Sequence, residues 1–227
     1  MTGVRRFLRE NSLGLFFGGI FLAALVGQSF AGWAVFNDTQ TADGLVPIGY
    51  LEYVTSSSFA ADVAENWQSE YLQFVLYIWA TVWFVQRGSP ESKELQQVGP
   101  ESDEDQEVGR SAGPWSPRWA GAGGFRQVVF SHSLLVVMGG IFLLSWAAQS
   151  AAGVVAFDEQ RLLDLEAPVT WARYVLSSDF WNRTLQNWQS EFLAVGSMAV
   201  LGVYLRQRGS PESKPVGAAD DDTGAEG

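Results

Sequence analysis

Four stretches of the chain are apolar and carry no charged residue. Two of them, Leu13–Phe36 and Leu134–Phe157, exceed the roughly 18 apolar residues that indicate a membrane span. The other two, Tyr71–Val85 and Phe192–Leu205, are shorter. They reach that length when the Asn-Trp-Gln-Ser-Glu segment before each is counted as part of the same helix. The pattern predicts an all-α membrane protein with four transmembrane helices.

Two other interpretations of the first stretch fit the residues less well. A helix of a soluble bundle would have a polar face, and Leu13–Phe36 has none. Arg5, Arg6 and Arg9 precede the stretch, as in a signal peptide, but the stretch is too long for one. Its counterpart Leu134–Phe157 is internal. We therefore expect both to be retained spans.

The sequence also repeats itself. A shift of 121 residues (133 − 12) places Ser12–Lys93 on Ser133–Lys214 without insertion or deletion. The identical segments include those that begin at Gly18, Gln28, Asn66 and Gln86: Gly-Gly-Ile-Phe-Leu, Gln-Ser, Asn-Trp-Gln-Ser-Glu and Gln-Arg-Gly-Ser-Pro-Glu-Ser-Lys. A fixed internal period indicates a duplicated unit. Each copy contains two of the four apolar stretches, so the fold is predicted to be two tandem two-helix repeats.

The duplication divides the chain into four segments. Residues 1–93 and 125–214 are the predicted two-span repeats. Residues 94–124 and 215–227 are rich in acidic residues, Gly, Pro and Ser, and such segments cannot bury a core. We expect the first to be a disordered cytoplasmic linker and the second to be a disordered tail.

Basic residues indicate the orientation. Arg and Lys flank the four spans at the ends that share one side, whereas the loop 37–65 has neither. The positive-inside rule therefore predicts a multi-pass protein of the cell (inner or plasma) membrane with both termini in the cytoplasm. Because each repeat has two spans, the copies are parallel.

Each outer loop is expected to hold an interfacial helix. Pro47 and Pro168 are suited to the first turn of such a helix, and aromatic residues follow both. Ser58 and Asp179, which occupy equivalent positions, are the expected N-caps of the second span of each copy.

Composition excludes several classes of function. The formal net charge of −11 argues against nucleic acid as a partner. The chain has no cysteine and a single histidine, and we find no nucleotide-binding loop, zinc spacing or hydrolytic triad. We therefore expect a non-enzymatic protein with no cofactor and no metal. Its expected partners are the lipid bilayer and, through small-residue helix faces, another membrane protein or a second copy.

Polar residues inside the spans form the candidate site. Gln28 lies 15 residues from Leu13, and Glu70 lies 15 residues from Val85. At 1.5 Å per residue both are about 22 Å from the inner boundary of the hydrocarbon core. The repeat adds the same residue types at the same level. The predicted polar cluster is Gln28, Ser29, Asn66, Gln68, Glu70, Gln149, Ser150, Asn187, Gln189 and Glu191.

Two interpretations of this cluster stay open. In the first it is structural, because most polar contacts between membrane helices only hold them together. In the second, Glu70 and Glu191 serve the permeation or transport of protons or small cations, because intramembrane carboxylates are typical of such routes. Against the second, no span contains a proline and the cluster lies above the midplane.

Other residues have expected packing roles. Trp67 and Trp188 fall where an interfacial aromatic belt is expected. Small residues at four-residue spacing predict a helix-packing ridge, which comprises Gly19, Ala23, Gly27 and Ala31, with Gly140 as part of a second copy. Such a ridge packs against another helix, either in the same chain or in a dimer.

The motif Asn-Trp-Gln-Ser-Glu-(Tyr/Phe)-Leu, present at Asn66 and Asn187, carries a resemblance to known proteins. Together with Gln-Arg-Gly-Ser-Pro-Glu-Ser-Lys it resembles an uncharacterised family, a domain of unknown function, of small bacterial integral membrane proteins. The resemblance covers both repeats. Tyr71 departs from the phenylalanine of the family motif. The family has no established activity, so the resemblance implies a bacterial membrane protein and no mechanism.

Overall fold

The computed structural model describes residues 3–224, and in this part of the chain every long element is an α-helix and there is no strand. Two single-turn 3₁₀ helices, η1 and η2, lie between α4 and α5. The elements are α1 (Gly3–Glu10), α2 (Ser12–Ala42), α3 (Tyr50–Val54), α4 (Ser57–Trp83), η1 (Leu95–Gln97), η2 (Gly109–Ser111), α5 (Phe125–Ser131), α6 (Ser133–Leu163), α7 (Trp171–Val175) and α8 (Ser178–Tyr204).

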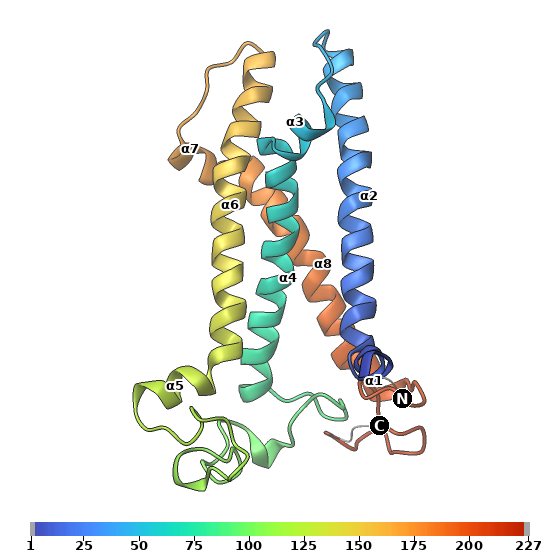
Figure 1. Ribbon diagram of the computed structural model, residues 1–227, viewed down its shortest axis with the longest axis vertical. Coiled ribbons are helices and arrows are strands. Elements are labelled where there is room, and N and C mark those ends of the chain that lie inside the picture. Colours follow the sequence, from blue (N-terminus) through green and yellow to red (C-terminus); the bar gives the residue numbers. More distant parts are fainter. Residues whose placement is uncertain (1–2, 225–227) are drawn as a thin grey trace.

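Four long helices run between two ends of the molecule (Figure 1). The short helices α3 and α7 lie near one end, which we call the loop end. Both chain termini and the 84–124 segment lie at the other, which we call the terminal end. The helices match in pairs: α2 and α6 have 31 residues each, α3 and α7 have 5, and α4 and α8 have 27.

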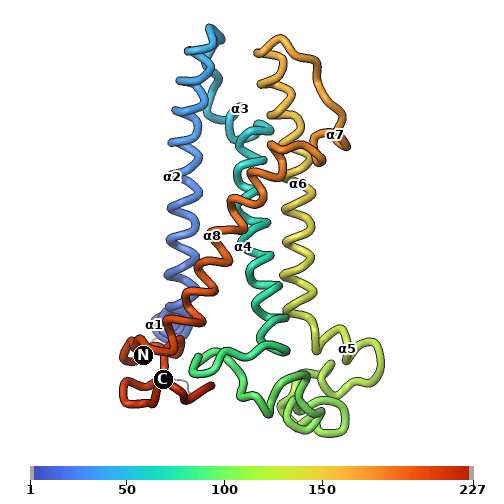
Figure 2. The backbone as a smooth tube through the Cα atoms, turned by 180° about the vertical axis from the view of Figure 1, so that it is seen from behind, coloured from blue at the N-terminus to red at the C-terminus, as the bar shows by residue number. Residues whose placement is uncertain are grey.

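The packing of the long helices is unequal. α4 packs along the length of α6, and α8 crosses α4 obliquely. α2 stands apart, and its main helix contacts are with α1 and α3 (Figure 2). Most of its side chains are consequently exposed, and Ser29 is the one buried residue that it contributes. The most extensive helix contact thus joins the second long helix of one copy to the first long helix of the other.

α2 and α6 are each long and apolar enough to cross a membrane. Both are apolar over most of their circumference, and large apolar side chains such as Phe16, Leu22 and Leu144 lie on the protein surface. Such exposure is costly in water and favourable in hydrocarbon. This agrees with a membrane location.

The starts of α4 and α8 differ from expectation by two residues. The N-caps are Ser56 and Ser177, whose hydroxyls accept hydrogen bonds from the backbone N–H of Phe59 and Phe180. Ser58 and Asp179 instead lie within the first turn of their helices. A run of serines offers several residues able to cap, and the extended backbone of Ser56 and Ser177 decides between them.

Candidate functional site at the loop end

The crossing of α4 and α8 is held by a cross-helix ion-pair network near the loop end. Arg183 on α8 donates to Glu65 (2.7 Å) and to Asp62 (3.0 Å), both on α4. Asn187, one turn further along α8, donates from its amide to the other oxygen of Glu65 (2.7 Å). Glu65 therefore accepts from two side chains of α8, and its own side chain is only 14% exposed.

A second layer of polar contacts lies one turn deeper. The indole N–H of Trp188 donates to the side-chain oxygen of Gln68 (2.8 Å). Gln68 and Thr184 are fully buried, and Gln149 on α6 is 2% exposed. Within the described residues, no partner reaches the Gln68 nitrogen, the Thr184 hydroxyl or either amide atom of Gln149. The junction of α4, α6 and α8 thus contains polar groups that are shielded and incompletely hydrogen-bonded, an arrangement that costs free energy.

Aromatic side chains surround this layer on the α6–α8 side. Trp146 stacks on Phe142 of its own helix, and its ring centroid lies 5.9 Å from that of Trp188 and 6.1 Å from that of Trp181. Phe180 joins the same group at 6.3 Å. Aromatic pairs at these separations add to the packing energy beyond the area they bury.

The cross-helix contacts join equivalent positions of the two copies. Asp62 and Arg183 are 121 residues apart, which is the repeat period, and Gln68–Trp188 and Glu65–Asn187 differ from that period by one residue. Glu191 also lies within electrostatic reach of Glu70, its equivalent. The copies of the second long helix therefore meet each other around this crossing point.

The outer loops are clamped to the first long helix of each copy by matching contacts. The Ser29 hydroxyl hydrogen-bonds the Tyr50 hydroxyl at 2.8 Å, and in the other copy Trp171 donates its indole N–H to the Ser150 hydroxyl at 3.1 Å. The side chain of Asn37 accepts from the backbone N–H of Ile48, as Asp158 does from Val169, both at 2.8 Å.

A tyrosine of each short helix lies directly against a glycine. The Tyr53 hydroxyl sits where a Cβ on Gly32 would be, and the Tyr174 hydroxyl does the same at Gly153. Both tyrosines are buried, and burial raises the pKa of Tyr174 to about 12. Both tyrosines belong to the aromatic residues expected in the interfacial helices, but their contacts with Gly32 and Gly153 were not predicted from the sequence. Their signal was that each pair is identical in the two copies.

The structure brings some of the predicted cluster together and leaves the rest apart. Gln68, Gln149 and Asn187 lie at the junction, whereas Ser29 and Ser150 belong to the loop clamps. Glu70 is exposed and Glu191 is half-buried. Gln28 and Gln189 are exposed, with no side-chain hydrogen bond among residues 3–224, and the Asn66 side chain donates to the Asp62 carbonyl of its own helix.

The predicted packing residues also have varied surroundings. Trp67 is 40% exposed and approaches Phe21 of α2, whereas Trp188 is half-buried at the junction. The ridge Gly19, Ala23, Gly27 and Ala31 is exposed. No atom lies within 4 Å of a Cβ built on Gly19, Gly27 or Gly140. Gly139, not Gly140, faces α4, at 3.9 Å from Val75.

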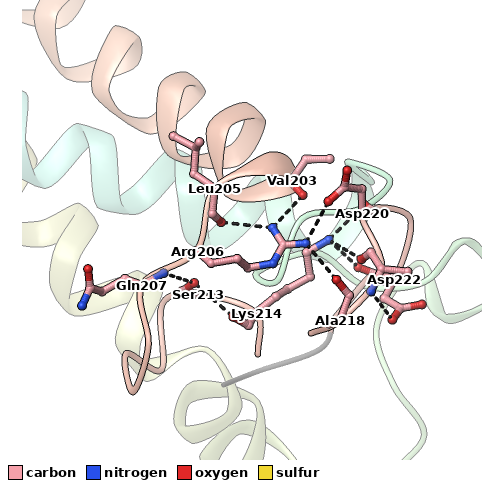
Figure 3. A network of polar contacts seen from close by, with 10 residues as sticks. Val203, Leu205, Arg206, Gln207, Ser213, Lys214, Ala218, Asp220 and Asp222 are labelled. Carbon is pink, nitrogen blue, oxygen red and sulfur yellow. Dashed lines mark hydrogen bonds and ion pairs between the residues drawn. The ribbon is translucent and has the colours of Figure 1, made fainter. Parts of the chain in front are cut away.

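At the terminal end, the second polar network surrounds Lys214 and Arg206 (Figure 3). The Lys214 side chain is fully buried and donates to the carbonyls of Ala219, Asp220 and Asp222. Arg206 forms an ion pair with Asp220 at 3.0 Å. Residues 218–222 therefore fold back onto the loop after α8.

A cleft of about 300 Å³ lies between the loop-end halves of α2 and α6. Its lining includes Tyr53 and the carboxylates of Asp43, Asp62 and Glu159. The cleft is therefore acidic.

Comparison with known proteins identifies a family and no activity. No curated protein and no solved structure matches the chain. The model of one family, described as a domain of unknown function (DUF6766), matches residues 4–225, and the chain belongs to that family.

Proposed function

We propose that this protein is a non-enzymatic, multi-pass protein of a bacterial cell membrane with a structural or scaffolding role. In this proposal α2, α4, α6 and α8 are four spans in two tandem parallel repeats, and α3 and α7 lie at the outer membrane surface. The loop end faces outward and both termini are cytoplasmic. The bilayer is the first partner, and a further membrane protein or a second copy is the second.

The structural role is supported by the hydrogen bonds that polar side chains form across the α4–α8 crossing. Arg183, Asn187 and Trp188 all donate to acceptors on α4. In a membrane, contacts of this kind stabilise helix association by on the order of 1 kcal/mol each. The polar residues of the crossing are thus used to fix helix positions.

Reconstitution tests the proposal. We would measure proton and small-cation flux into proteoliposomes for the unmodified protein and for Glu70→Gln/Glu191→Gln at equal reconstitution. A structural role predicts no flux above empty liposomes for either. Glu65→Gln serves as a matched control, because it also removes a carboxylate of α4 but is expected to lower thermal stability. Flux that disappears in a folded Glu70→Gln/Glu191→Gln protein would contradict the structural proposal.

A second candidate function is the permeation or transport of protons or small cations. Two observations favour it: Glu70 and Glu191 lie within electrostatic reach of each other, and the loop end carries an acidic cleft. A carboxylate pair beneath an acidic outer opening would concentrate cations. The same flux measurement separates this candidate from the first.

A further inference from the structure

Two faces of the molecule are exposed although their counterparts in the other copy are tightly packed. α4 buries Ala61, Ala64 and Gln68 where it packs along α6, and α6 buries Ser145 and Gln149. The equivalents on α8 and α2 are exposed: Asn182, Leu185 and Gln189 on α8, and Ala24 and Gln28 on α2. Each of these helix faces is therefore packed against another helix in one copy and exposed in the other.

Lipid is a poor cover for these open faces. Gln28 and Gln189 carry amide groups at the depth of the outer half of the proposed spans. An amide without a hydrogen-bond partner in hydrocarbon costs several kcal/mol. Polypeptide can supply such a partner, since Gln68, the equivalent of Gln189, accepts a hydrogen bond from Trp188, whereas the covered Gln149 has none among residues 3–224. A polypeptide face is therefore a better partner here than lipid.

The α4–α6 contact shows which polypeptide fits. Since α2 is the repeat equivalent of α6 and α8 of α4, the open faces of α2 and α8 occupy the positions that correspond to the packed faces of α6 and α4. In one chain these two helices approach each other only toward the terminal end and diverge toward the loop end (Figures 1 and 2). Gln28 lies past the middle of α2, toward the loop end, and Gln189 lies in the loop-end half of α8. Within one chain, then, the faces are apart where the amides lie.

We infer that two copies of the chain form a twofold dimer in which α2 of each copy packs on α8 of the other. A twofold arrangement forms this contact twice and leaves neither face open. The inference rests on the proposed membrane embedding of α2 and α8. It does not depend on whether the protein conducts ions.

Cysteine pairing tests the inference cleanly because the chain has no cysteine of its own. The Cβ position of Gly139 is 3.9 Å from Cγ2 of Val75, so the two positions face each other across the α4–α6 contact. Val75→Cys/Gly139→Cys is therefore the control within one chain. The equivalent pair is Gly196 on α8 and Gly18 on α2, both with no atom within 4 Å of their Cβ positions.

We would co-express two differently tagged copies, one carrying Gly18→Cys and the other Gly196→Cys, and oxidise native membranes. The inference predicts that the monomer band shifts to a dimer carrying both tags. Phe16→Cys with Gly196→Cys is the matched control. Phe16 is exposed on the opposite side of α2, so this pair should remain monomeric.

Two outcomes would overturn the inference. One is the absence of the mixed dimer while Val75→Cys/Gly139→Cys oxidises. The other is a disulfide that forms only when Gly18→Cys and Gly196→Cys are in the same chain. The second case is recognised by cleaving a protease site placed within residues 94–124, since fragments of one chain then stay linked. Neither result bears on the flux experiment, so the two proposals fail separately.

Discussion

Gly32 and Gly153 are the residues at which an added methyl group has the least space at the loop end. We expect Gly32→Ala to destabilise the protein by about 1–3 kcal/mol, because the new Cβ would overlap the Tyr53 hydroxyl. Thermal unfolding in detergent measures the effect. Gly14→Ala is the control, since no atom lies within 4 Å of that Cβ position. Tyr53→Phe should partly restore stability to Gly32→Ala, and a variant that melts like Gly14→Ala would refute the steric argument.

Glu65 and Asp62 contact the same guanidinium but should respond differently to loss of charge. Glu65→Gln is expected to cost about 1–2 kcal/mol, because Glu65 accepts charge-assisted bonds from two side chains and is mostly buried. Asp62 is 47% exposed and accepts one such bond, so Asp62→Asn should be nearly neutral at pH 7. Equal losses of stability for the two variants would show that Arg183 interacts equally strongly with Glu65 and Asp62.

At the scale of elements, the outer loops are held by paired clamps, and one clamp is suited to a double-mutant cycle. Ser150→Ala and Trp171→Phe each remove one partner of the hydrogen bond between α6 and α7. We expect a coupling free energy of about 0.5–1.5 kcal/mol between them. Ser133→Ala provides the control with Trp171→Phe, because Ser133 bonds only the Phe130 carbonyl beside its own helix start. Additive effects in both pairs would mean that the clamp adds nothing to stability.

Element type was predictable from the sequence because four long apolar stretches admit little besides helices. Helix boundaries were less so: three consecutive serines at 56–58 offer similar caps, and only backbone conformation selects Ser56. The packing face was harder still. Gly139 and Gly140 are adjacent in sequence and about 100° apart around the helix, and contact with Val75 chooses the first. Periodicity of small residues alone contains no information about the partner.

The candidate site shows the same limit. Identity between the copies drew attention to Gln68, Gln149 and Asn187, which lie at the junction in the structure. It gave no reason to select Arg183 or Glu65, because their equivalents are Asp62 and Gln186. A contact between two copies around a shared axis joins a residue to its own equivalent. Such a contact favours side chains that complement each other, as Asp62 and Arg183 do. When the two copies are aligned, these positions differ and therefore do not stand out as conserved between the copies.

At the scale of the whole molecule, α2 and α6 are the two helices within residues 3–224 that are long and apolar enough to cross a membrane by composition, whereas we propose four spans. The two topologies place the connecting segments differently. With four spans, the linker 94–124 returns to the side of the N-terminus. With two, α4 and the linker stay on the far side until α6 crosses back, and α7 then lies on the side of the termini.

Thiol labelling of single-cysteine variants distinguishes these topologies. Val46→Cys and Leu176→Cys probe the two outer loops, and Leu95→Cys and Val216→Cys probe the linker and the tail. All four side chains are exposed. Four spans predict that an impermeant maleimide labels the first pair in intact cells and the second pair only after permeabilisation. Two spans predict labelling of Leu95→Cys and protection of Leu176→Cys in intact cells. The linker and the second loop thus give opposite labelling results for the two topologies. Labelling of Leu95→Cys in intact cells would show that α4 is not a span, and Glu70 would then not lie at the proposed depth in the membrane.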